Sequence, residues 1–349
     1  MDFNLIDINE DNNYYKMEIK NREGIKKLTP ARGFKKIDDN SYPYFNEVLS
    51  SIKHDKLSGM NNYDTFDRNI EHRIKSKESK NNINIITFYG DKNTDILEMS
   101  KFEDIGLIDN FEKLFNDNII SMPYALSLYE KGALENIFDG IKKSYDNFIS
   151  TLNTKNIFCY VPAYVKYKDL DQFLRFYSEK NLGTVNGGGQ SYNAIPLYID
   201  FKRSNPDAFK RTIAMLFKLK KQYMKDGFYP VLYAANVSRP RILNTGSRVI
   251  AREFLLAFLG FDIIGSSLAF NPRASKMGYT HDNKLLEFSM ETFEYSYNNK
   301  NINKKSYKDK NKSEIYSRQS SFLGGLNGEQ TKNELKKRPG AEKYIKTYE

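Results

Sequence analysis

Between residues 118 and 288, short apolar segments alternate with amphipathic ones, and this alternation restricts the fold more than any other feature. The apolar segments read as strands, and the longer segments between them carry apolar residues at three- and four-residue steps, which predicts helices. The predicted strands are Asn118–Met122, Ile157–Val161, Ile195–Phe201, Pro230–Ala235 and Phe261–Ile264. Near-continuous apolar strands separated by such helices are typical of a parallel sheet covered by helices.

Four strand–helix units followed by a further strand fit the second half of a (β/α)₈ barrel of the TIM type, which is the fold we expect. An open doubly wound sheet fits the same alternation, so periodicity alone leaves both folds open. In a barrel, functional residues lie where strands end and the following loops begin. The strand ends fall at Pro123-Tyr124, Pro162–Tyr164, Asp200, Ala235–Ser238 and Gly265–Ser267.

The composition divides the chain into three parts. Residues 1–80 are polar and hold few periodic segments, so we expect the N-terminal half of the barrel to be irregular there, with Leu28–Phe34 as one candidate for an early strand. Residues 81–294 form the predicted barrel. Residues 295–349 are polar and basic, and we expect a partly disordered tail because such a composition buries too little surface to offset chain entropy.

Cysteine and histidine usage limits the chemistry. The 349 residues include one cysteine, Cys159, and three scattered histidines, so we expect neither a disulfide framework nor a metal centre, and no cofactor. No apolar run approaches the roughly 20 residues that span a bilayer, and the acidic N-terminus is unlike a signal peptide. We therefore expect a cytoplasmic protein without a membrane partner. The net charge of +10 suggests a polyanionic partner.

Four segments in order carry a family resemblance. Gly260–Ser266 (GFDIIGS) looks like a G-[IV]-D-x-F-D-x motif, and Asn271–Thr280 is loosely similar to T-R-x-A-R-x-G-x-x-F-T. Tyr229–Ala235 is similar to P-x-[YH]-L-x-G-x-G, and Val161–Leu170 to V-Q-G-G-x-Y-x-D-L-R. Together they resemble the tRNA-guanine transglycosylase superfamily. That resemblance implies a barrel pentosyltransferase that exchanges guanine in nucleic acid for a 7-deazaguanine base.

Three departures from the family pattern shape this expectation. Gly265, 15 positions before Thr280, stands where the family has its nucleophilic Asp, and Pro162–Tyr164 replaces the family's Gln-Gly-Gly. The family's zinc site is also absent. These departures favour a branch like the phage and bacterial enzymes that insert 7-deazaguanines into DNA, so we favour DNA over tRNA as the substrate. If the protein is encoded by a phage, it would act in the cytoplasm of the host. The departures also fit a non-catalytic, nucleic-acid-binding partner subunit. The chain would act as a homodimer or with a partner subunit.

Base exchange needs a nucleophile for the sugar and an acid/base for the purine, and carboxylates suit both roles. Asp200 ends an apolar strand, where an unpaired carboxylate is costly to bury, so it is a candidate for chemistry or for a buried ion pair. Asp262, three residues before Gly265, is a second candidate, or a residue that closes the loop before its strand. Asp91 follows Ile85–Gly90 and weakly resembles the acid of a family D-S-G-G-F motif, or it is a turn residue.

A glycine-rich segment and a group of basic residues complete the candidates. The segment is Gly187, Gly188, Gly189 and Gln190, which the resemblance implies as a base-binding loop and which otherwise reads as a flexible connection. The basic residues, Arg239, Arg241, Arg248, Arg273 and Lys276, follow the last two strands and would hold a nucleic-acid backbone unless they are only solvated. A barrel enzyme acting on a small phosphorylated substrate is a further alternative, which rests on fold analogy.

Overall fold

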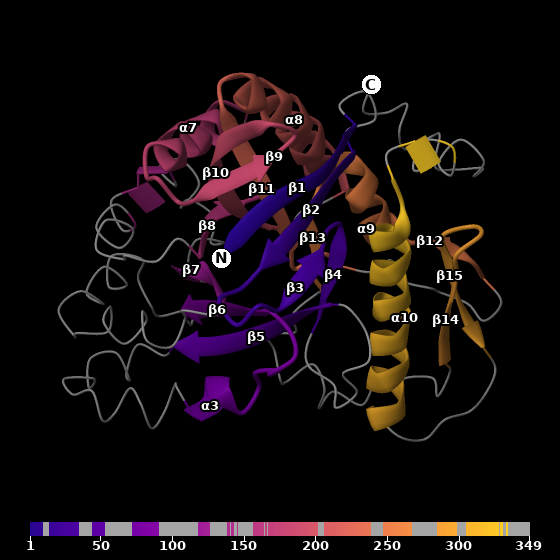
Figure 1. Ribbon diagram of the computed structural model, residues 1–349. Helices are drawn as coiled ribbons and strands as arrows, with labels where there is room; N and C mark the ends of the chain where they lie inside the picture. Colours follow the sequence, from indigo (N-terminus) through magenta and orange to yellow (C-terminus); the bar gives the residue numbers. More distant parts are fainter. Residues whose placement is uncertain are drawn as a thin grey trace.

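The computed structural model describes residues 1–9, 14–34, 44–52, 72–90, 118–125, 138–139, 141–142, 145, 156–163, 165, 167–201, 206–238, 247–266, 285–298, 305–327, 329–330 and 333. Within these ranges, eight parallel strands form a closed barrel with helices on its outside (Figure 1). The predicted α/β barrel is therefore confirmed, and the open doubly wound sheet is wrong.

The barrel strands follow one another around the barrel in chain order. They are β4 (Ala31–Phe34), β5 (Phe45–Ile52), β6 (Asn84–Gly90), β7 (Ile119–Ala125), β8 (Ile157–Pro162), β10 (Gln190–Asp200), β11 (Phe228–Ala235) and β13 (Ile263–Ile264). Pairing of β10 with β11, and of β13 with both β11 and β4, closes the ring. The five predicted strands correspond to β7, β8, β10, β11 and β13, and β4 lies inside the candidate segment Leu28–Phe34.

A mixed extension of the sheet, antiparallel except between β9 (Thr184–Gly187) and β1 (Asp2–Asn9), adjoins the barrel through the long strand β10. The first residues of β10 pair with β9, whose other edge pairs with β1. The sheet continues through β2 (Tyr14–Lys20) to β3 (Lys26–Leu28). The polar N-terminal region thus contributes this extension as well as the first barrel strands.

The helices on the barrel wall follow the predicted pattern in part. After β8 comes α7 (Tyr167–Ser178), and after β10 comes α8 (Pro206–Lys225), which begins at a proline. The segment 249–259, between β11 and β13, does not form a single helix but consists of β12 (Val249–Ile250), α9 (Arg252–Leu255) and a 3-10 helix, η5 (Leu256–Leu259). A one-turn helix, α3 (His72–Lys75), precedes β6. None of the described helices has both the length and the hydropathy needed to cross a membrane.

Two described segments of the region predicted as a partly disordered tail form regular structure. β15 (Glu294–Asn298) pairs with β14 (Leu285–Ser289) and with β12 in a small second sheet. A long helix, α10 (Lys305–Gly325), follows and packs against β4 (Figure 1).

Polar contacts explain why the composition of α10 did not predict that this helix packs against the barrel. Besides Leu323, the helix buries the polar residues Gln319 and Ser320. The backbone N–H of Arg32 on β4 donates to Ser320 Oγ at 2.8 Å, and the Arg32 guanidinium lies 4.3 Å from the centre of the Tyr316 ring. Because buried serine and glutamine side chains fill part of this interface, the helix shows little apolar periodicity.

Candidate active site

A layer of tyrosines fills the barrel interior near the carboxyl ends of three strands. The strand register aligns Tyr198 on β10 with Tyr160 on β8 and with Tyr233 on β11, so all three side chains point inward. The ring centroids of Tyr198 and Tyr233 lie 5.1 Å apart, and those of Tyr160 and Tyr198 lie 6.1 Å apart. All three side chains are buried, as expected for residues that fill a small barrel.

Asp200 is the last residue of β10 and lies on the same inward face as Tyr198. Its carboxylate is fully buried and accepts hydrogen bonds from Asn236 Nδ2 at 2.7 Å and from the Tyr160 hydroxyl at 3.3 Å. Asn236 directly follows β11 and has a φ of 55°, a left-handed conformation that asparagine tolerates better than most residues. The structure therefore places Asp200 at the carboxyl end of the barrel interior, as its position in the sequence suggested.

A second carboxylate in this interior belongs to Glu47 on β5, which the sequence did not single out. Glu47 is only 4% exposed. One carboxylate oxygen accepts a hydrogen bond from the Tyr233 hydroxyl, and the other accepts from Ser266 Oγ at 2.6 Å and from the Ser266 backbone N–H at 3.2 Å. Tyr233 thus links Glu47 to the tyrosine layer that borders Asp200.

Two glycines leave space for the Glu47 side chain inside the barrel. β4 and β13 lie between β5 and β11; Gly33 is on β4 and Gly265 directly follows β13, and both face the barrel interior. A Cβ atom at position 33 would lie 3.2 Å from Glu47 Oε1. A Cβ atom at position 265 would overlap the same oxygen and lie 2.9 Å from the Tyr233 hydroxyl. The Glu47 carboxylate therefore occupies the space that a side chain at position 265 would enter.

Burial and hydrogen bonding have opposite effects on the pKa of Glu47. Burial raises the pKa of the Glu47 carboxyl group, while hydrogen bonds from Ser266 and Tyr233 and the positive charge of Arg32 act to lower it. The net pKa lies above the usual glutamate value. Two carboxylates that border one tyrosine layer, held by different partners, form an arrangement suited to covalent and acid–base catalysis.

Asp262 lies outside the barrel and apart from this site. Its carboxylate accepts a hydrogen bond from the Leu232 backbone N–H at 2.7 Å and lies 3.3 Å from Lys220 Nζ on α8. Lys220 is in turn 4.5 Å from the ring centre of Tyr15 and 4.6 Å from that of Tyr229. Asp262 and Lys220 are both buried, so the pair fastens α8 and β2 to the barrel wall.

The glycine-rich segment forms the turn between β9 and β10. Gly188 and Gly189 have φ values of 60° and 76°, which suit a two-residue hairpin turn. A Cβ atom at Gly187 would lie 2.9 Å from the Cα atom of Leu5 on β1. Backbone geometry accounts for all three glycines. The turn lies at the amino end of β10, and the structure does not bring Gln190 together with Asp200 at the other end of that strand.

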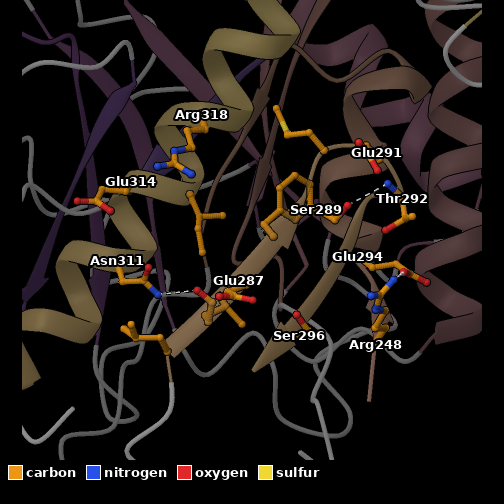
Figure 2. Close-up of a pocket in the computed structure, with 15 residues that line it drawn as sticks. Arg248, Glu287, Ser289, Glu291, Thr292, Glu294, Ser296, Asn311, Glu314 and Arg318 are labelled. Carbon is orange, nitrogen blue, oxygen red and sulfur yellow. Dashed lines mark hydrogen bonds and ion pairs between the residues drawn. The ribbon is translucent and has the colours of Figure 1, made fainter. Parts of the chain in front are cut away.

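The predicted basic residues are only partly covered by the described structure. Asp91, Arg239, Arg241, Arg273 and Lys276 lie outside the described residues. Arg248 Nη1 lies 4.0 Å from Glu294 Oε2, beside a cavity of about 560 Å³ between β14 and α10 (Figure 2). Glutamates and arginines both line this cavity, and it belongs to the small second sheet and α10 rather than to the barrel interior.

Among the described residues, no group of three or more His, Cys, Asp or Glu side chains is placed to hold a metal ion. The chain matches no protein-family model, and no curated protein matches its sequence.

Proposed function

We propose that this protein is a transglycosylase that exchanges guanine for a 7-deazaguanine base in nucleic acid, with DNA favoured over tRNA. The observation that carries the proposal is the position of the Glu47 carboxylate. The resemblance to guanine transglycosylases implies a nucleophilic carboxylate at position 265, where this chain has glycine. Glu47 supplies a carboxylate at that place from another strand.

In the proposed reaction, Glu47 first releases to solvent the proton that burial favours on its carboxyl group, and the resulting carboxylate attacks C1′ of the target nucleotide. The C1′–N9 bond breaks, its electron pair leaves with guanine, and Asp200 as a carboxylic acid gives the departing purine its proton. The incoming base then returns a proton to Asp200 and attacks C1′, which breaks the Glu47 ester bond. Atoms and charges balance without a cofactor.

The contacts of the two carboxylates support these roles. Ser266 donates from both its backbone and its hydroxyl group to one oxygen of Glu47, so the carboxylate is held in a fixed orientation. Asn236 and Tyr160 fix Asp200 in the same manner. A nucleotide in duplex DNA must leave the base stack to reach a barrel interior, as in other enzymes that act on a base.

The test is incorporation of a labelled 7-deazaguanine base into duplex DNA and into tRNA. We expect incorporation by the wild type and a loss of at least about 1,000-fold in Glu47→Gln and in Asp200→Asn. Glu179→Gln, at an exposed position just after α7, serves as the control and is expected to keep full activity.

Failure of the folded wild type to incorporate any base into either nucleic acid would refute the enzymatic proposal. The partner-subunit alternative, which Gly265 motivates, would then apply. It requires nucleic-acid affinity that is the same in the wild type, Glu47→Gln and Asp200→Asn. Loss of exchange in these two variants, with exchange in the wild type, excludes it.

A further inference from the structure

The solvent-facing side of α8 carries only positive charge over its described side chains. Arg211, Lys218 and Lys225 are exposed, and Lys221 is half-buried on the same face. No Asp or Glu occurs between residues 211 and 225. Arg211, Lys218 and Lys225 follow one another at seven-residue steps, which places them about 10 Å apart along the helix. We refer to Arg211, Lys218, Lys221 and Lys225 as the α8 basic face.

These charges lack the compensation found on the neighbouring helix. None of the four forms an ion pair with any residue in the described part of the chain. On α7, by contrast, Arg175 Nε lies 2.9 Å from Asp171 Oδ2, and the helix carries two acidic and two basic residues. Unpaired cations on one helix face produce a local positive potential that attracts polyanions.

Aromatic side chains border the α8 basic face. Lys218 Nζ lies 5.8 Å from the centre of the Tyr167 ring, and Tyr167 is 40% exposed. Lys221 Nζ lies 5.1 Å from the centre of the half-buried Phe217 ring. Cations interleaved with accessible rings offer contacts to phosphates together with flat surfaces for sugars or bases.

We infer that the α8 basic face binds the sugar–phosphate backbone of the nucleic-acid substrate. This inference rests on the proposed function and assigns it a surface outside the barrel interior. α8 begins six residues after Asp200, so its Arg211 end lies on the side of the catalytic carboxylates, while Lys225 lies toward the amino ends of the strands. Figure 1 shows α8 beside α7 on the outer wall of the barrel. Nucleic acid bound along α8 would therefore lead toward the carboxyl end of the barrel.

A quadruple variant tests this assignment: Arg211→Gln, Lys218→Gln, Lys221→Gln and Lys225→Gln. Its control removes the same four charges from exposed positions elsewhere: Arg22→Gln, Lys80→Gln, Lys310→Gln and Arg318→Gln. Binding to a fluorescent duplex DNA is measured by anisotropy over a range of salt concentrations, and circular dichroism verifies that both variants are folded. We expect the α8 variant to bind about 10- to 100-fold more weakly at low salt, with a salt slope reduced by up to about 3.6. The control should change affinity by less than about threefold.

The possible results separate the inference from the proposed function. Equal weakening in both variants would mean that net charge alone attracts DNA, and would overturn the inference. The inference would also be overturned by an α8 variant that binds DNA normally but has lost binding to vesicles of anionic lipid. If the wild type exchanges bases and the α8 variant binds DNA normally, only the inference fails. If the wild type binds neither DNA nor tRNA, the proposed function fails with it.

Discussion

Of the two carboxylates in the candidate site, Asp200 could be predicted from the sequence and Glu47 could not. Asp200 ends a clear apolar strand, so the cost of burying its charge marks it as unusual. Glu47 lies in a segment, FNEVLSSI, that mixes polar and apolar residues without a clear period, within a polar N-terminal region. Its role depends on Gly33 and Gly265, which are distant in sequence and become neighbours only when β4, β5 and β13 are side by side.

Gly265→Ala tests whether the glycine makes room for Glu47. The added methyl group would collide with the Glu47 carboxylate and crowd the Tyr233 hydroxyl. We expect a loss of about 1–3 kcal/mol in unfolding free energy, measured by urea denaturation, and loss of base exchange. Gly325→Ala is the control, because a Cβ atom there meets no other atom within 4 Å. Unchanged stability and exchange in Gly265→Ala would contradict the described position of Glu47.

Glu47 should also leave a signature in the pH dependence of stability. Because its pKa is raised in the folded chain, the folded state binds a proton that the unfolded state has already released. The unfolding free energy of the wild type should therefore fall relative to that of Glu47→Gln as pH rises above the ordinary glutamate pKa. Urea denaturation of both proteins between about pH 5 and pH 8 measures this difference. A difference that is constant with pH, or that grows, would show that the Glu47 pKa is not raised.

At the scale of elements, the sequence predicted the strands well and the position of their connections less well. β10 was predicted to begin at Ile195 but begins at Gln190, so the glycine-rich segment is a hairpin turn at the opposite end of the strand from Asp200. Asp262, at the start of the last strand, was a candidate for chemistry or for closing the loop before that strand. It is the residue before that strand and faces outward to Lys220, because side chains alternate between the two faces of a strand.

Lys220→Met tests the structural role of the Asp262–Lys220 pair. The substitution leaves Asp262 buried without its cation, so we expect a loss of about 3–5 kcal/mol in unfolding free energy. Adding Asp262→Asn to this variant should recover part of the loss. Lys221→Met, at the next position on α8, should change stability by less than about 0.5 kcal/mol. A Lys220→Met protein as stable as the wild type would show that the pair does not fasten α8 to the barrel.

A substitution in α10 tests whether the C-terminal region is part of the fold. Leu323 is fully buried, so Leu323→Ala should cost about 2–4 kcal/mol in unfolding free energy. Lys310→Ala, at an exposed position on the same helix, should cost little. Thermal denaturation of both variants gives the comparison. Equal stability of the two variants would show that α10 does not contribute to the folded structure.

On the scale of the whole molecule, the barrel could be predicted because it follows from local periodicity and chain order. The mixed extension, the small second sheet and α10 could not be predicted, because they depend on pairing between segments that are distant in the sequence and on buried polar side chains. Another contact between distant segments is Lys16 Nζ donating to the backbone oxygen of Leu326 at 3.3 Å. Within the described structure, part of the basic excess lies on the α8 basic face, which was not among the predicted basic residues.

The identity of the nucleophile is the most direct test of the proposed mechanism. The protein is incubated with duplex DNA, quenched in acid and digested, and mass spectrometry locates any nucleotide bound covalently to a peptide. We expect the adduct on the peptide that contains Glu47, and no adduct in Glu47→Gln. An adduct on a peptide that contains Asp200 or Asp262, or base exchange by Glu47→Gln at the wild-type rate, would contradict the role assigned to Glu47.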